Sequence, residues 1–148
     1  MTPERPAALI ALVCFAHVLT LMGVFAFPAL LPMFIAEWSL TNAQAGWISG
    51  IPLAANAISV SVLVSLTDRI DARYIFGAGA LLGALALAGF ELLASGFWSA
   101  LIFRALAGVA MASPYMPGLR VLVDRYKGDA QSRSVALYTA SFSLGTAL

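Results

Sequence analysis

Residues 7–34 read AALIALVCFAHVLTLMGVFAFPALLPMF and contain no Asp, Glu, Lys or Arg. Because a helix rises 1.5 Å per residue, roughly 20 such residues are enough to cross the hydrocarbon core of a bilayer. The stretch is also longer than the roughly 7–15 apolar residues of a signal-peptide core, and it contains Pro28 and Pro32. We therefore predict a membrane-spanning helix here and not a cleaved signal.

Further apolar stretches follow at 43–66, 74–95 and 97–123, and a fifth begins near Arg133 and stops at Leu148. None of them shows the alternating strands of about ten residues that build a membrane barrel. The sequence therefore predicts an all-α, polytopic transmembrane helix bundle whose fifth span is incomplete. Local signals mark two helix starts, because Thr41 and Gln44 have the spacing of a capping box and Asp71 can cap the third helix.

The basic residues are sorted between the two sides of this bundle. Of the eight Lys and Arg residues, all but Arg104 fall in the N-terminal tail or in the second and fourth connections: Arg5, Arg69, Arg73, Arg120, Arg125, Lys127 and Arg133. The first connection carries only Glu37, and Glu91 lies beside the third. Since Lys and Arg are retained on the cytoplasmic side, we expect a multi-pass protein of the cell (inner or plasma) membrane with a cytoplasmic N-terminus.

The composition restricts the class of protein. The chain is 61% hydrophobic and 10% charged, whereas soluble domains carry about 25% charged residues. Its net charge of +1 gives no hint of a nucleic-acid partner, and the lipid bilayer is the partner that the composition implies. One cysteine (Cys14) and one histidine cannot form a zinc site. Without a nucleophile constellation or a phosphate-binding loop, we expect no enzyme activity, no cofactor and no metal.

Arg104 is the charged residue that lies clearly inside a span, roughly 10 Å from its outer end. Placing an arginine there costs about 2.5–3.5 kcal/mol or more, so intramembrane charges usually serve substrate binding or coupling. Two structural alternatives remain open. Arg104 can extend to the outer interface, or it can pair with a carboxylate.

Three polar residues within the predicted spans are further candidates for substrate binding or coupling. His17 lies in the middle of the first span, where it can carry a proton or bind substrate, although such histidines more often bind a neighbouring helix. Asn56 belongs to a polar stripe in the second span that faces other helices or a cavity. Tyr115 lies at helical spacing from Arg104 on a face that also carries Gly108.

Small residues recur at four-residue spacing, which lets helix backbones approach closely in lipid. The pattern does not show which helices pack together. The pairs are Gly46 with Gly50, Gly79 with Gly83, and Gly108 with Ala112.

Four segments, in order, resemble the major facilitator superfamily of secondary transporters. Residues 40–47 (LTNAQAGW) are similar to the start of that family's second helix, and 104–108 (RALAG) to its Arg-x-x-x-Gly element. Residues 66–73 (LTDRIDAR) resemble the signature Gly-x-Leu-x-Asp-Arg-x-Gly-Arg-Arg. Val64, Asp71 and Ala72 depart from it by replacing two glycines and one basic residue. Asp124 followed by Arg133 resembles the charges that flank the inner loop before helix five.

The resemblance implies twelve helices in two six-helix halves, of which residues 1–148 would be a partial, truncated N-terminal domain with the C-terminal half absent. It implies a small-molecule substrate, with an organic or inorganic anion as a candidate, and a coupling proton or ion. Arg104, His17, Asn56 and Tyr115 would lie on helices that line the substrate path. Asp68, Arg69 and Arg73 would form a conformational switch loop.

A second reading belongs to a different class, a small multispan scaffold or assembly subunit without transport activity. In that case the helices only pack, and Arg104 contacts a partner helix. The nucleotide sequence downstream of Leu148 separates the two readings. A frame encoding about seven more spans would favour the transporter, and a stop codon would favour the subunit.

Overall fold

The computed structural model describes residues 6–66 and 68–147, apart from the side chains of residues 6, 7, 9, 115 and 116. Every regular element in these ranges is a helix, as predicted: α1 (Pro6–Trp38), α2 (Asn42–Leu66), α3 (Ala72–Leu93), α4 (Phe97–Arg125) and α5 (Asp129–Ala147). Within the described residues, α1 to α4 each contain a segment long and apolar enough to cross a membrane.

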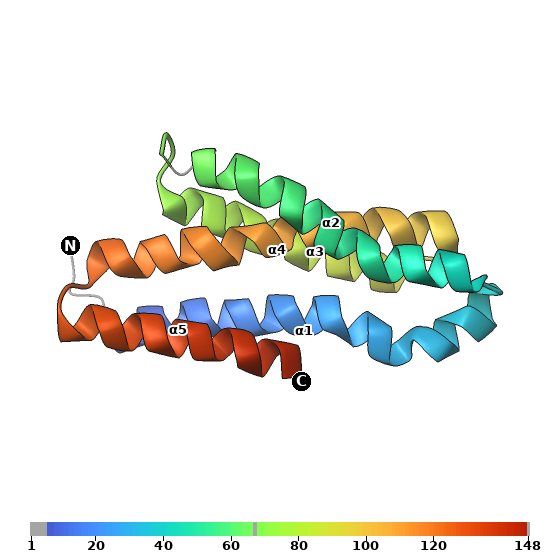
Figure 1. Ribbon diagram of the computed structural model, residues 1–148, viewed down its shortest axis with the longest axis horizontal. Helices are drawn as coiled ribbons and strands as arrows, with labels where there is room; N and C mark the ends of the chain where they lie inside the picture. The colour runs from blue at the N-terminus through green and yellow to red at the C-terminus, as the bar shows by residue number, and fades with distance from the viewer. Residues whose placement is uncertain (1–5, 67, 148) are drawn as a thin grey trace.

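The helices run back and forth along one axis (Figure 1). The N-terminal end of α1 and the α2–α3 and α4–α5 connections lie at one end of the bundle, and the α1–α2 and α3–α4 connections lie at the other. Six of the eight Lys and Arg residues therefore gather at the first end, which we call the basic end: Arg69, Arg73, Arg120, Arg125, Lys127 and Arg133. Arg5 lies outside the described residues.

Two helices differ from their predicted bounds by four residues at one end, whereas the other bounds agree within two residues. α1 continues through Pro28 and Pro32 to Trp38, beyond the predicted end at residue 34, and it changes direction towards that end (Figure 1). Aromatic packing supports the extension, because Phe34 contacts the rings of both Trp38 and Phe90. α5 begins at Asp129 and not at Arg133, directly after Gly128, whose φ of 63° is a conformation that glycine adopts without steric cost.

The two predicted helix caps are confirmed. The Thr41 backbone N–H donates to Gln44 Oε1 at 2.9 Å, and the Gln44 backbone N–H donates to Thr41 Oγ1 at 3.3 Å, which completes the capping box. The Asp71 carboxylate accepts a hydrogen bond from the backbone N–H of Arg73 at 2.9 Å, so it caps α3.

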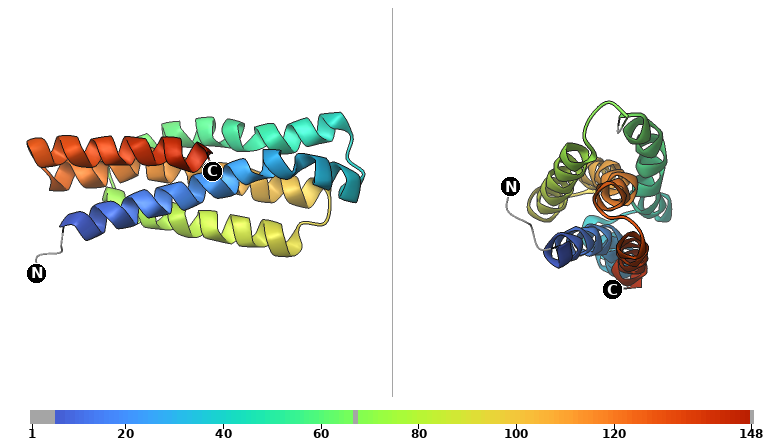
Figure 2. Two further views of the ribbon diagram at one scale, coloured as in Figure 1. Left: turned by 90° about the horizontal axis from the view of Figure 1, so that it is seen from below. Right: turned by 90° about the vertical axis from the view of Figure 1, so that its left-hand side faces the viewer.

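The central helix of the bundle is α4, which packs against α1, α2 and α3, while α5 lies mainly along α1 (Figure 2). Small residues permit the close crossings. A Cβ on Gly108 would collide with the backbone of Pro52 in α2, and one on Gly79 would collide with the side chain of Ser113. A Cβ added at Gly46 or Gly50 would have no atom within 4 Å. Among the described residues, this predicted pair therefore forms no close helix crossing.

Candidate functional site

Arg104 is buried between α4 and α1, with 3% of its surface exposed. Its Nη1 donates a hydrogen bond to the backbone carbonyl of Val24 at 2.7 Å, and its guanidinium lies 4.9 Å from the centre of the Phe27 ring. The side chain is thus held inside the bundle and does not extend to the interface. No described carboxylate forms an ion pair with it.

The sequence of α1 explains why Val24 needs a donor. In a helix this carbonyl would accept from the backbone N–H four residues later, but that residue is Pro28, which has none. Arg104 supplies the missing donor from another helix. The proline was visible in the sequence, but the residue that would satisfy the carbonyl was not.

A cavity of about 220 Å³ lies beside Arg104, between α1, α3 and α4. Aromatic rings form much of its wall, and Glu91 also lines it; the rings are those of Phe27, Phe34, Phe90 and Phe103. The Arg104 Nε has no hydrogen-bond partner among the described residues and is buried. A buried cation with an unsatisfied N–H can bind an anionic group, because a charge-assisted hydrogen bond there would offset its desolvation.

His17 is 1% exposed and binds α5. Its Nδ1 lies 3.0 Å from Ser141 Oγ, and its ring stacks on Tyr138 with 4.6 Å between centroids. Because the Ser141 hydroxyl donates to the Tyr138 carbonyl at 2.6 Å, the Nδ1 of His17 acts as the donor to Ser141. The Tyr138 hydroxyl in turn donates to the carbonyl of Pro114, so α1, α5 and α4 are joined. This is the arrangement expected of a histidine that binds a neighbouring helix.

Sequence reasoning missed Tyr138 and Ser141. A signal was present, because the buried face of α5 consists of Ser134, Tyr138, Ser141 and Gly145, at spacings of three and four residues. Asn56 is half-buried on α2, and its side chain makes no hydrogen bond among the described residues. The side chain of Tyr115 lies outside the described residues. The structure therefore places Arg104 against α1 at Val24, seven residues after His17, and joins neither residue to Asn56.

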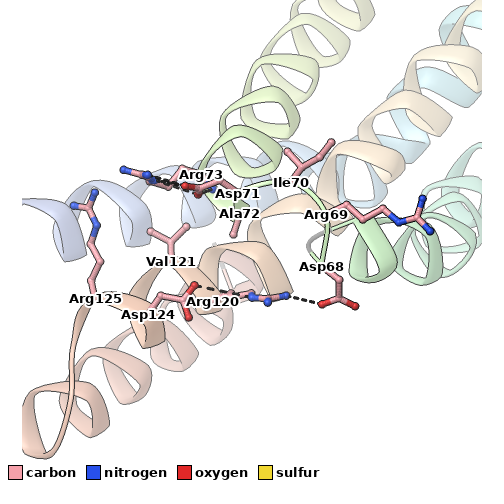
Figure 3. Close-up of a pocket in the computed structure, with 10 residues that line it drawn as sticks. All are labelled: Asp68, Arg69, Ile70, Asp71, Ala72, Arg73, Arg120, Val121, Asp124 and Arg125. Atoms are coloured by element: carbon pink, nitrogen blue, oxygen red, sulfur yellow. Dashed lines mark hydrogen bonds and ion pairs between the residues drawn. The ribbon is translucent and has the colours of Figure 1, made fainter.

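The predicted switch loop forms two separate ion pairs at the basic end (Figure 3). Asp68 accepts from Arg120 of α4, with 3.0 Å between Oδ1 and Nη1, and Arg120 Nε lies 4.0 Å from Asp124. Arg73 pairs with Asp71 at 2.6 Å. The Arg69 side chain points away from both pairs. The sequence placed Arg120 at the same end of the bundle as Asp68 but did not identify it as the partner of Asp68.

The electrostatics of Asp71 follow from this geometry. The Arg73 side chain donates from Nε and Nη2, and the Arg73 backbone N–H donates as well. These bonds stabilise the ionised carboxylate, and they lower the pKa of Asp71 from 3.8 to about 2. Across 6–66 and 68–147, no three His, Cys, Asp or Glu side chains are grouped so that they could hold a metal ion.

Two curated relatives that the chain matches are much longer than the chain itself. The human Protein spinster homolog 1 is 24% identical over 100% of this chain and 28% of its own length. The Niacin transporter NiaP of Acinetobacter baylyi (strain ATCC 33305 / BD413 / ADP1) is 24% identical over 83% of this chain and 27% of its own length. The chain thus spans less than a third of either protein.

No solved structure matches the chain significantly. The family comparison is decisive, because residues 13–148 match the Major Facilitator Superfamily, a range that contains α2 to α5 and most of α1. The order of motifs, the all-helical bundle and this match agree, and the chain belongs to the Major Facilitator Superfamily.

Proposed function

We propose that this chain is the N-terminal portion of a secondary transporter that moves a small solute across a membrane by alternating access. The observation that carries the proposal is the family match over residues 13–148. Transporters of this architecture place the substrate between two halves that rock about it, and this chain provides helices of one half. The C-terminal half is then a required partner.

We further propose a small anion as the substrate class, with Arg104 as its anchor. The support is the buried guanidinium, whose Nε lacks a partner beside a cavity of about 220 Å³. The relative named as a niacin transporter is consistent with this class, because niacin is a pyridine carboxylate. His17, Asn56 and Tyr115 contribute less in this proposal, and a proton or another ion is coupled to transport.

The loop residues Asp68, Arg69 and Arg73 are proposed to act in switching and not in substrate binding. The Asp68–Arg120 ion pair joins the α2–α3 connection to α4. Any rearrangement that separates these two elements must break the pair, so its strength biases the conformational equilibrium.

Uptake into proteoliposomes tests the function. The intact protein should accumulate labelled nicotinate or another small anion from a panel of carboxylates and inorganic anions, in a saturable manner. Liposomes containing only residues 1–148 should match empty liposomes, because the second half is missing. Accumulation by the 148-residue chain alone would overturn the two-half proposal. Failure of the folded intact protein to move any anion of the panel would overturn the substrate class.

The orientation is tested separately. We propose a cytoplasmic N-terminus in the cell membrane, because the basic end carries six of the eight Lys and Arg residues. In a Cys14→Ala background, an impermeant thiol reagent should label Ser95→Cys in intact cells and should label Lys127→Cys only after permeabilisation. Labelling of position 127 in intact cells would reverse the assignment.

A further inference from the structure

Two cavities meet at Ile70, at the basic end of the bundle. The first, which we call the basic cavity, has a volume of about 420 Å³ and is lined by residues 68–73 together with Arg120, Val121, Asp124 and Arg125 (Figure 3). The second, the apolar groove, has a volume of about 330 Å³ and lies between α2, α3 and α4. Ile70 lines both of them.

The basic cavity suits a phosphate group. Its lining has a net formal charge of +1, because it includes four arginines and three aspartates: Arg69, Arg73, Arg120, Arg125, Asp68, Asp71 and Asp124. A guanidinium carries five N–H donors, and an arginine that binds a carboxylate can therefore also bind a phosphate oxygen. The ion pairs at Asp68 and Asp71 hold two of these guanidinium groups at the cavity.

The apolar groove suits a hydrocarbon chain. Its wall carries aliphatic side chains, with Leu63 and Leu66 on α2, Leu82 on α3 and Val109 on α4. From Tyr74 to Leu82 it follows α3 for about 12 Å away from the basic end. Tyr74 is 74% exposed and lies in the first turn of α3, where its amphipathic ring fits the headgroup level of a membrane.

We propose that the two cavities together bind one anionic phospholipid, with its phosphodiester in the basic cavity and the first part of an acyl chain in the apolar groove. Because α1 to α4 cross the bilayer lengthwise, the basic end lies at the level of the headgroups of one leaflet. Basic pockets between helices at that level attract anionic lipids. A free phosphate would leave the groove empty, and a zwitterionic lipid would not match the excess positive charge.

The position of this lipid would allow it to regulate the conformational equilibrium of the protein. Its headgroup would lie between the α2–α3 connection and α4, the same two elements that the Asp68–Arg120 pair joins. The lipid composition of that leaflet would therefore shift the conformational equilibrium that this pair biases. Binding of the lipid does not require transport, so the proposal can be tested independently of the substrate.

Native mass spectrometry of the intact protein, titrated in detergent with phosphatidylglycerol or phosphatidylcholine of the same chains, tests the headgroup. We expect at least fivefold tighter binding of phosphatidylglycerol. Arg69→Gln and Arg125→Gln should each weaken it by about fivefold. The matched control Lys127→Gln removes an equal charge at the same end but outside the lining of the cavity, and it should change binding less than twofold. Equal affinity of the unmodified protein for the two lipids would overturn the proposal, and this result needs no variant to fold.

A second set of binding measurements tests the acyl-chain site and distinguishes a bound lipid from a free anion. Ala78→Phe should fill the apolar groove and weaken phosphatidylglycerol at least fivefold, whereas Ala84→Phe, at an exposed position on α3 outside the groove lining, should not. Glycerol 3-phosphate should bind much more weakly than the lipid and should be unaffected by Ala78→Phe. If glycerol 3-phosphate binds as tightly as the lipid, the site is for a soluble phosphate and the lipid proposal fails.

Discussion

Arg104 in α4 donates a hydrogen bond to the Val24 carbonyl of α1, the carbonyl that Pro28 leaves without its helical partner. The bond is 2.7 Å long and joins residues 80 apart in the sequence. A proline in one helix and an arginine in another therefore form one unit, which holds a positive charge inside the bundle. The guanidinium then keeps its Nε for another acceptor.

Arg104→Lys is expected to keep expression and folding but to lose most transport in the intact protein. A lysine can donate to Val24, but it cannot also offer a second, fixed N–H to a carboxylate or an oxyanion. His17→Ala and Tyr115→Phe should have smaller effects. Uptake should be compared with Lys127→Arg, an exposed control. Near-normal uptake by Arg104→Gln would reduce Arg104 to a structural residue.

Arg104→Met, which leaves no side-chain donor at this position, should destabilise the protein less when Pro28 is replaced by alanine. Losing the donor to a buried carbonyl costs about 1–3 kcal/mol, and an alanine at position 28 restores an N–H within α1. Thermal unfolding of the single and double variants gives the coupling. Pro32→Ala is the control, since it restores a donor to a different carbonyl. Additive effects of Arg104→Met and Pro28→Ala would contradict the link between Arg104, the Val24 carbonyl and Pro28.

Gly108→Ala should lower the thermal stability, and Gly50→Ala should leave it unchanged or raise it. Both changes gain about 1 kcal/mol of helix propensity. A Cβ at Gly108 meets the Pro52 backbone, which cannot move without separating α2 from α4, whereas a Cβ at Gly50 has nothing within 4 Å. We expect a net cost of about 1–3 kcal/mol at Gly108. Equal melting temperatures for the two variants would contradict the observed crossing.

Asp68→Asn should slow transport severalfold while leaving substrate affinity and stability nearly unchanged. The pair with Arg120 is exposed, with 72% of the Asp68 side chain accessible, so it contributes at most about 1 kcal/mol to folding. Its effect on the rate comes from the conformational equilibrium. The charge swap Asp68→Arg with Arg120→Asp should recover part of the rate. A large loss of affinity at an unchanged maximal rate would place Asp68 in substrate binding instead.

The stability difference between the unmodified protein and Asp71→Asn should depend on pH. Because the pKa of Asp71 is lowered from 3.8 to about 2, chiefly by the Arg73 side chain, its ionised form stabilises the folded state. This contribution is fully present above about pH 4 and is lost as the pH falls towards 2. An asparagine can still cap α3, so the change isolates the pairing. Arg73→Gln should lose stability in the same window, and a difference that persists unchanged at pH 2 would exclude this cause.

The sequence alone determined the class of fold, because a lipid environment restricts the chain to helices and sorts its charges. Capping at Thr41 and Asp71 was also predictable, since those bonds span two or three residues. Arg104 stood out by its cost inside a span. Each of these signals is compositional or local, so no knowledge of helix packing was needed.

Only the tertiary structure decided the partners. The bonds of Arg104 with Val24, Asp68 with Arg120 and His17 with Ser141 join residues separated by 80, 52 and 124 positions. Which donor meets which acceptor depends on the rotation and register of each helix against its neighbours. Those are set by the summed packing of small and large side chains, as where Gly108 lets α4 approach Pro52. A residue pattern within one helix cannot contain that information. It identifies the residues that share one face of the helix, but not the residues of other helices that this face contacts.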